Sequence, residues 1–425
     1  MIKLVGGHSK VFYILISVFL LFCKTINSSQ IYDYETEKFI EKINYEILSV
    51  NNYSKKIKLR IINDNFPNAF VVEENTIFLS AGLLIYSPDY VSLLAVLAHE
   101  IGHLEKNHII KRKKEINDLK RISSLSNLVA IAGSMIIQDP QLINAVVVNQ
   151  TTINNLYINF TQDQEREADL YAVETLNKLK LSTDSVKEFL FILEKQTKFD
   201  LLDEEFKKFS THPLFKERYK ILDSNKNIDF VNYDKNLNKE FNFIKAKFMA
   251  YTNTNSINNL KGDEEIYYNA IKSSLSGNLL ESLKNLNLLI SKYDNNFFLI
   301  ETKADILLSY GYTKEAINFY KKVLNKYPDN HNVKYNIFIN FKHNTKKKEI
   351  IKDIFEENIK LISLFPNNQA LLSKFYDLSK ILENKDWKIF FQLLLFKNND
   401  LKNNLISLQK QTKDINLKKI IKIYI

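Results

Sequence analysis

A motif that recurs every 34 residues constrains the fold of this chain more than any other feature. It occurs at residues 292–296 (KYDNN), at 326–330 (KYPDN) and, 38 residues further along, at 364–368 (LFPNN). Thirty-four residues is the length of the helix–turn–helix unit of tetratricopeptide repeats. Small residues that permit close packing of two helices recur at the same spacing, as Ala270, Gly277, Ala304 and Gly311. The recurrence predicts a solenoid of stacked helical pairs, with an unrelated bundle of amphipathic helices as the alternative.

The length and charge of the chain set the broad class. Its 425 residues are too many for one ordinary core and fit two domains. Hydrophobic residues make up 45% and charged residues 25%, which is typical of a globular protein. The net charge of +10 comes mainly from lysines spread along the chain, without a dense basic run interleaved with aromatic residues. This pattern argues against nucleic acid as a partner.

The first thirty residues have the three-part layout of a secretory signal peptide. Lys3 and Lys10 precede an apolar run over residues 11–22, and small polar residues follow at 27–29. The run is shorter than the roughly 20 residues that span a bilayer, although an uncleaved anchor is the alternative. We therefore expect a cleaved signal peptide over residues 1–28.

The segment between the signal and the repeats alternates helical and strand patterns. The predicted elements are a helix over residues 34–50, a strand over 57–63, two strands around a turn within 70–79, and helices over 89–106, 160–179 and from 184 onward. Two apolar stretches at 128–137 and 142–148 are too short to cross a membrane and indicate short helices or a covering loop. The whole chain is expected to be mainly α with a small β-sheet.

Residues 97–103 (LAHEIGH) carry the most informative chemical motif. On a helix, His99 and His103 project from the same face, where two imidazoles can take two corners of a zinc tetrahedron. Glu100 is rotated by about 100° from His99, towards the open coordination position. A catalytic zinc needs a third protein ligand and leaves its fourth position to water.

Three further features favour a metal site over a chance match. Residues 91–98 are apolar, so both histidines are expected in the interior, where they need partners. Gly102 costs about 1 kcal/mol relative to Ala inside a helix, which indicates that another segment approaches closely there. A carboxylate-rich helix over residues 164–169 (QEREAD) offers candidates for the third ligand.

These motifs together resemble the Ste24-type zinc metallopeptidases, in the bacterial periplasmic branch that carries tetratricopeptide repeats behind the protease domain. The resemblance rests on four motifs, at residues 99–103 (HEIGH), 165–169 (EREAD), 67–70 (PNAF) and 211–213 (THP), the last followed by Arg218. It covers residues 33–222 in order and spacing, and the repeats more loosely. It implies one zinc ion per chain and a zincin-like α+β metallopeptidase domain followed by an α-solenoid of tetratricopeptide repeats. The expected divisions are a signal peptide over 1–28, the metallopeptidase domain over 29–228, a helical connector over 229–264 and the repeats over 265–425.

By this resemblance Glu165 is the third zinc ligand beside His99 and His103. Asp169 lies one turn further along the same face and is expected to accept a hydrogen bond from a zinc-bound histidine. Glu167, on a different face from Asp169, is the weaker rival as third ligand. Arg218 is expected to anchor the His-Pro segment through an ion pair.

His212 and His108 lie outside the main motif. Taken alone, a His before Pro is most often structural, here as the start of a helix. By the resemblance, His212 lies near the metal, either as a fourth, inhibitory ligand or as a transition-state donor, and it joins Glu100 among the catalytic candidates. His108, five residues after His103, is expected on the wrong side of the helix to take part.

The resemblance implies a periplasmic zinc-dependent endopeptidase, peripheral membrane association being compatible with it. Its expected substrates are unfolded or misassembled envelope proteins, including outer-membrane proteins, and its repeats are expected to bind substrate or an assembly machinery. Glu100 would pass a proton from water to the leaving amine, and the strands over 70–79 would pair with an extended substrate. The alternative is a chaperone or adaptor of envelope protein assembly whose metal site is regulatory, but a pure binder has no need for Glu100. The sequence does not indicate an oligomeric state.

Overall fold

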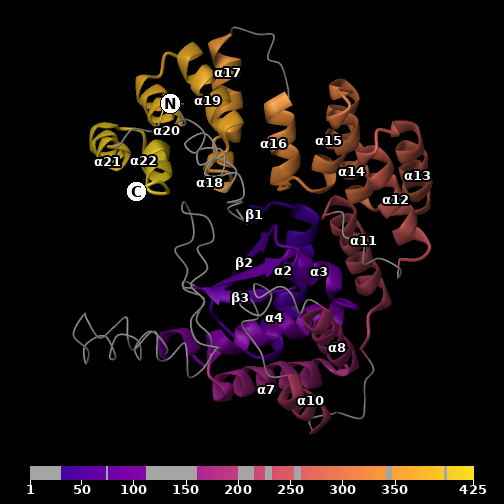
Figure 1. Ribbon diagram of the computed structural model, residues 1–425. Coiled ribbons are helices and arrows are strands. Elements are labelled where there is room, and N and C mark those ends of the chain that lie inside the picture. The colour runs from indigo at the N-terminus through magenta and orange to yellow at the C-terminus, as the bar shows by residue number, and fades with distance from the viewer. Residues whose placement is uncertain are drawn as a thin grey trace, which may run out of the picture. The chain divides into compact units, whose positions relative to one another are not determined.

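The computed structural model describes residues 30–72, 75–111, 160–199, 215–224, 232–252, 260–340, 347–396 and 400–425 (Figure 1). The chain divides into two compact units, one comprising Met1–Tyr32 and Thr36–Phe248 and the other Asp33–Glu35 and Met249–Ile425. The expected signal peptide, the apolar stretches at 128–137 and 142–148, and His212 all lie outside the described residues.

A four-stranded sheet forms one part of the first unit. Its strands are β1 Gln30–Ile31, β2 Lys58–Ile62, β3 Ala69–Val72 and β4 Thr76–Ser80, and they pair in the order β1-β2-β4-β3. β3 and β4 form the expected antiparallel pair. Asn75, just before β4, has a left-handed backbone angle (φ 56°), which asparagine tolerates better than most residues. The parallel pairing of β2 with β4 joins strands separated in sequence by β3, and local sequence patterns did not predict it.

Helix α2 (Tyr34–Val50) has the bounds that its apolar spacing predicts. Its residues Phe39, Ile40, Ile43 and Ile47 recur at helical spacing, and none is more than 4% exposed. Phe39 stacks on Phe241 of α11 (Lys235–Thr252), with 5.7 Å between the ring centroids. One apolar face therefore joins α2 to the core of the first unit.

Helix α4 (Tyr90–Glu105) packs against β3 and against helix α7 (Gln162–Leu179), and it lies between them in Figure 1. It follows the short helix α3 (Ala81–Tyr86) and starts where predicted, because Asp89 and Ser92 cap its first turn reciprocally. Nearly all of its residues are buried. An amphipathic surface helix would bury one face only, so α4 is a central helix of this unit.

Helix α7 begins near the predicted position, and α10 (Phe215–Ser224) packs beside it, whereas α8 (Asp184–Phe199) packs against α4 and α10. Gly102 of α4 marks the close approach that its presence predicted. A Cβ atom at Gly102 would lie 3.1 Å from both Ala168 Cα and Tyr171 Cβ of α7. This contact fixes the spacing of the two helices that carry the candidate metal ligands.

The second unit is helical throughout its described residues. Its helices are α12 Asp263–Leu275, α13 Leu279–Lys292, α14 Phe297–Ser309, α15 Thr313–Lys326, α16 His331–Asn340, α17 Lys348–Asn358, α18 Leu361–Leu364, α19 Gln369–Ile381, α20 Lys385–Leu395, α21 Leu401–Gln411 and α22 Ile415–Ile421. The starts of α12, α14 and α16 follow the 34-residue period of the sequence. Consecutive helices pack on one another, in agreement with a helical repeat region. The specific assignment to tetratricopeptide repeats stays a prediction.

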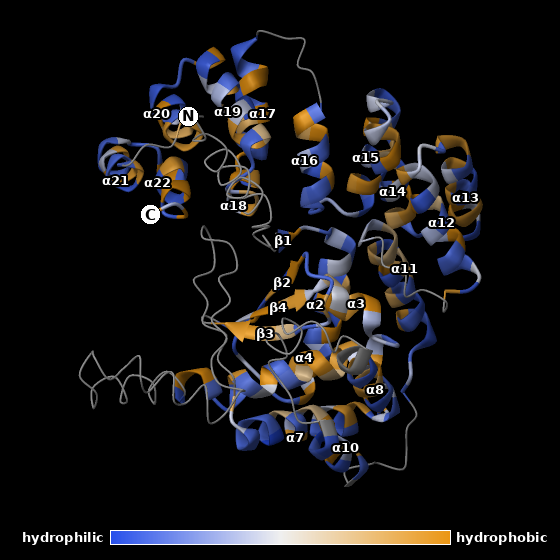
Figure 2. Cartoon of the chain, viewed as in Figure 1, coloured by the Kyte–Doolittle hydropathy of each residue, from blue (hydrophilic) through white to orange (hydrophobic). Residues whose placement is uncertain are grey.

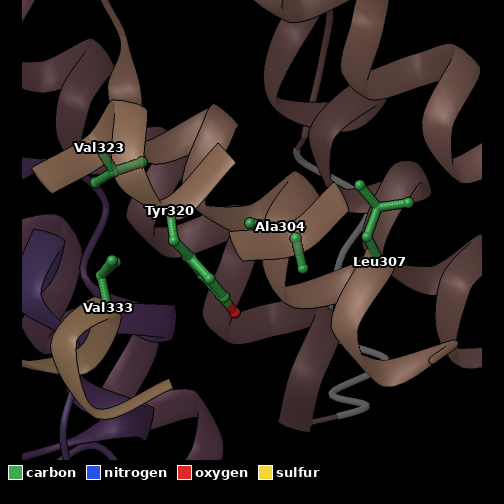
Figure 3. Packing of buried hydrophobic residues seen from close by; sticks show 6 residues of the cluster. Ala304, Leu307, Tyr320, Val323 and Val333 are labelled. Atoms are coloured by element: carbon green, nitrogen blue, oxygen red, sulfur yellow. The ribbon is translucent and has the colours of Figure 1, made fainter. Parts of the chain in front are cut away.

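One core cluster of the second unit joins three successive helices. Ala304 and Leu307 come from α14, Tyr320 and Val323 from α15, and Val333 from α16 (Figure 3). Ala304 is fully buried, as expected of a small residue where two helices pack. These three successive helices therefore share one apolar core, as adjacent units of a helical repeat do.

The repeated glycines serve a different purpose from the one predicted. Gly277 and Gly311 both have φ of 84°, directly after helices α12 and α14, and a Cβ at either position would meet no atom within 4 Å. The left-handed backbone at the corner between two helices, rather than close packing, requires glycine here. The corresponding left-handed position after α19 is occupied by Glu383, with φ of 55°, rather than by glycine.

Figure 2 shows hydrophobic residues concentrated in strands β2 and β3 of the first unit. Among the helices that the structure describes, none combines the length and the apolar character needed to cross a membrane.

Candidate metal centre

Two imidazoles from helix α4 meet at the centre of the site. His99 and His103 are about one turn apart, and their Nε2 atoms lie 3.1 Å from each other. His99 is 3% and His103 0% exposed. The helical spacing places both rings on one face, in the interior of the unit, as the sequence predicts.

Glu165 brings a carboxylate to the same point from α7. Its Oε2 lies 3.4 Å from Nε2 of His99, and its Oε1 lies 3.5 Å from Nε2 of His103. Thr161 caps the start of α7 and thereby places Glu165 in the first turn of that helix. In the part of the chain that the structure describes, these three residues form the one group found that is able to hold a metal ion.

The spacing of the three donors fits zinc. Two ligands of a tetrahedral zinc ion, each about 2.0–2.2 Å from the metal, lie about 3.3–3.5 Å from each other. The two imidazole Nε2 atoms lie 3.1 Å apart, slightly closer than this range. One Glu165 oxygen lies 3.4 Å from Nε2 of His99 and the other lies 3.5 Å from Nε2 of His103, both within it. Two imidazoles and one carboxylate are also the donor set of a catalytic zinc site that keeps its fourth position for water.

Glu100 lies next to His99 in the sequence and is 1% exposed. It is not part of the ligand group, in agreement with the rotation of about 100° between successive helical residues. Burial disfavours the charged guanidinium of Arg218, but the carboxylates of Asp169, Glu165 and Glu100 outweigh this effect and raise the pKa of Arg218. A buried carboxylate therefore stands beside the ligand group without belonging to it.

Asp169 and Arg218 hold the outer side of His99. Oδ1 of Asp169 lies 2.8 Å from Nδ1 of His99, and Arg218 donates to both oxygens of Asp169 over 2.9–3.1 Å. Burial favours the neutral form of Asp169, but Arg218 and His99 outweigh it and hold the pKa of Asp169 below its ordinary value. Burial lowers the pKa of His99, but Asp169 and Glu165 outweigh it and raise that pKa, so the Asp169 carboxylate makes His99 a more basic ligand.

His108 was wrongly predicted to point away from the site. Its Nδ1 lies 2.9 Å from Nδ1 of His103, and its side chain is fully buried. The prediction assumed a continuous helix, but α4 ends at Glu105 and Asn107 has a left-handed backbone angle (φ 56°). This turn redirects the chain so that His108 faces His103. An asparagine just after the last buried position of a helix is a known stop signal and was the available clue.

Glu167, the rival candidate for third ligand, does not lie in the ligand group. It accepts a hydrogen bond from Nε2 of His108 at 3.0 Å, and its side chain is 49% exposed. This hydrogen bond is the main cause that lowers the pKa of Glu167, whereas burial lowers the pKa of His108 and favours its neutral form. Glu167 is therefore joined to the site through His108.

Phe160 is a neighbour of the site that the sequence did not single out. Its ring stacks on that of His103 with 3.7 Å between the centroids and 19° between the planes. It immediately precedes Thr161, the cap of α7, and Glu165 follows it five residues later in the first turn of that helix. No local pattern marks an aromatic residue in this position as part of a metal centre.

His212 lies outside the described residues, and its assignment as a plug or a donor stays a prediction. Arg218, expected to anchor its segment, is placed by α10 and reaches the site through Asp169. The ion pair expected of Arg218 is thus present, with Asp169 as the partner.

The edge strand β3 lies beside the helix that carries the two histidines. β3 pairs with β4 along one side, and no strand in the described ranges pairs with its other side. An extended peptide that joins a sheet pairs with a strand in such an outer position.

Comparison with known proteins gives a consistent result. Residues 35–226 match the sequence profile described as "Peptidase family M48". The chain is also similar to the beta-barrel assembly-enhancing protease of Escherichia coli (22% identity over 298 residues, 66% of this chain and 60% of the relative). It is also similar to the beta-barrel assembly-enhancing protease of Yersinia pestis, over a shorter region (27% identity over 192 residues, 43% of this chain and 37% of the relative). The aligned region thus spans less than two thirds of these relatives' own length.

Proposed function

We propose that the chain is a zinc-dependent endopeptidase and that residues 35–226, which match the profile of peptidase family M48, form its protease domain. The single observation that carries the proposal is the donor group of His99, His103 and Glu165, with spacings of 3.1–3.5 Å in a buried site. His99 and His103 come from one helix and Glu165 from a second one packed tightly against it.

Each residue of the site has a role in this proposal. His99, His103 and Glu165 would hold one zinc ion per chain, which when bound polarises the scissile carbonyl and lowers the pKa of its water. Glu100 takes a proton from a water molecule whose oxygen forms a bond to the scissile carbonyl carbon, and it passes this proton to the amide nitrogen, which leaves as the free amine when the C–N bond breaks. Asp169 accepts from Nδ1 of His99 and so keeps the Nε2 lone pair directed at the metal position.

The position of β3 as the outer strand of the described sheet supports an extended polypeptide as the substrate. A peptide added to this edge as a further strand would form backbone hydrogen bonds that do not depend on its side chains. It would lie beside α4, and thus beside the donor group. This mode of binding suits a protease that accepts many unfolded sequences.

The names of the relatives favour a role in the bacterial envelope. We place the chain in the periplasm, exported by a signal peptide over residues 1–28, where it would cleave unfolded or misassembled outer-membrane proteins. The proposed divisions remain a metallopeptidase domain over 29–228, a connector over 229–264 and repeats over 265–425 that bind substrate or an assembly machinery. A chaperone or adaptor with a regulatory metal site is the second candidate, and the helical repeat region favours it.

Replacement of Glu100 by Gln tests the enzymatic role. Purified Glu100→Gln should keep one zinc per chain by elemental analysis and should lose cleavage of casein, because an amide cannot transfer the proton. Glu105→Gln is the matched control, since Glu105 ends the same helix and is exposed. Full casein cleavage by Glu100→Gln would refute the mechanism, and wild-type protein that binds zinc but never cleaves would favour the adaptor.

A further inference from the structure

The end of helix α4 brings a third imidazole to the metal centre. The helix stops at Glu105, Asn107 turns the backbone through the left-handed region, and His108 begins the next helical turn. The N–H of Lys111 then donates to the carbonyl of Asn107 at 3.0 Å. His108 is held in this position by backbone structure on both sides.

The two contacts of His108 determine where its proton lies. A zinc ion bound at Nε2 of His103 leaves the proton of that ring on Nδ1, so Nδ1–H of His103 must donate to Nδ1 of His108 at 2.9 Å. Nδ1 of His108 then accepts and cannot carry a proton. Its proton lies on Nε2, which donates to Glu167 over 3.0 Å. One arrangement of protons satisfies both hydrogen bonds.

We propose that His108 is a positioning residue for His103, and that Glu167 fixes the orientation and tautomer of His108 from the surface side. The inference rests on the proposed zinc site and adds to it a chain of three residues that ends at a half-exposed carboxylate. His108 touches neither the metal position nor the reacting atoms. It acts by holding the ring of His103 in the orientation in which Nε2 meets the other two donors.

Two nearly isosteric replacements of His108 separate positioning from packing. Asn places an amide oxygen close to where Nδ1 of His108 stood, and this oxygen can accept from His103, whereas Leu has the same shape without an acceptor. We expect His108→Leu to weaken zinc binding by about 10–100-fold and His108→Asn to recover most of this loss. Chelator competition measures the affinity, the visible spectrum of the cobalt-substituted protein reports the ligand geometry, and thermal unfolding of the metal-free forms controls for stability.

The outcomes of this experiment are distinct. Zinc affinity and a cobalt spectrum unchanged in His108→Leu would overturn the inference, as would equal losses in the Leu and Asn variants. Wild-type protein that does not bind zinc would refute the proposed function itself, and with it the inference. If the wild type binds zinc and the His108→Leu variant binds it with the same affinity, the inference about His108 fails while the proposed function stands.

A measurement on the wild type does not depend on the folding of any variant. Long-range proton–nitrogen NMR of histidine side chains in the zinc-loaded protein distinguishes the two neutral tautomers. We expect a proton on Nδ1 of His103 and on Nε2 of His108. A proton on Nδ1 of His108 would overturn the inference, because both Nδ1 atoms cannot donate into one hydrogen bond.

Discussion

The two histidines of the metal centre are held in different ways. His99 donates to a carboxylate, Asp169, which is itself paired with Arg218, and all of these groups are buried or nearly so. His103 meets a neutral ring, His108, and only through it a carboxylate, Glu167, whose side chain is 49% exposed. The same task, fixing one ring nitrogen of a proposed zinc ligand, is performed once by a buried ion pair and once by a chain of residues that reaches the surface.

This difference leads to different expectations for folding and for metal binding on the two sides of the centre. An anion next to His99 raises its basicity, but a buried charge pair must stay complete, because either partner alone is costly in the interior. The neutral imidazole of His108 is a weaker hydrogen-bond acceptor for His103 than a carboxylate is. Its outer partner, Glu167, is half exposed, so water can replace that carboxylate. We therefore expect changes on the His99 side to affect both folding and metal binding, and changes on the His103 side to affect metal binding with little effect on folding.

The largest expected effect comes from Asp169→Asn. This change leaves Arg218 without its anionic partner, and breaking a buried ion pair costs about 3–5 kcal/mol. We expect a loss near 3 kcal/mol in the free energy of unfolding, because the Arg218 side chain keeps 15% exposure. Zinc affinity should fall by about 10–100-fold as His99 loses its charged acceptor. Denaturant unfolding of the metal-free protein and chelator competition measure the two effects separately.

Asp163→Asn provides the matched control for this prediction. Asp163 lies on the same helix, its side chain is 81% exposed, and it forms an ion pair with the exposed Arg166. A surface pair of this kind contributes between about 0 and 1 kcal/mol. If Asp169→Asn were no more destabilising than Asp163→Asn, the distinction between the two sides of the centre would fail.

An intermediate loss of zinc affinity is expected from Gly102→Ala, because this change moves Glu165 relative to both His99 and His103. The added Cβ would lie 3.1 Å from Ala168 Cα and Tyr171 Cβ, so α7 must move by a few tenths of an ångström away from α4. Overpacking destabilises the fold by about 1–3 kcal/mol, whereas the higher helix propensity of alanine stabilises it by about 1 kcal/mol. The free energy of unfolding should therefore change little. Zinc affinity should fall by about 10-fold, because Glu165 moves away from both histidines. Unchanged zinc affinity would show that the contact between α4 and α7 does not set the ligand spacing.

The residues on the His99 side of the centre lie within uninterrupted helices. Helical periodicity puts His99 and His103 on one face of α4, and Asp169 one turn beyond Glu165 on α7. The choice of Glu165 itself came from the family resemblance, and its role as a metal ligand stays a prediction. The starts of α12, α14 and α16 are spaced by the 34-residue period of the sequence, as expected where each repeat is a local unit. Gly102 correctly indicated a close approach, although its partner helix lies some sixty residues further along the chain.

The His103 side could not be predicted in the same way. The position of His108 depends on where α4 ends, and a single left-handed residue, Asn107, changes the direction of the chain there. Helical periodicity extended past Glu105 puts His108 on the wrong face. The contact of Phe160 with His103 and the pairing of β2 with β4 join segments far apart in sequence, and only tertiary structure determines them.

The smallest expected effect comes from Glu167, and it tests the comparison most finely. Glu167→Gln keeps an oxygen that can accept from Nε2 of His108, so zinc affinity should stay within about three-fold of wild type. Glu167→Ala removes the acceptor, but water can take its place because the side chain is 49% exposed, and the loss should not exceed about 10-fold. Neither variant should change the free energy of unfolding by more than about 0.5 kcal/mol, as for an ordinary surface position. Chelator competition and denaturant unfolding, run beside Asp169→Asn, measure both quantities. A loss of stability in Glu167→Ala as large as in Asp169→Asn would contradict the comparison, because it would mean that the chain from His103 to the surface is as essential to the fold as the buried ion pair.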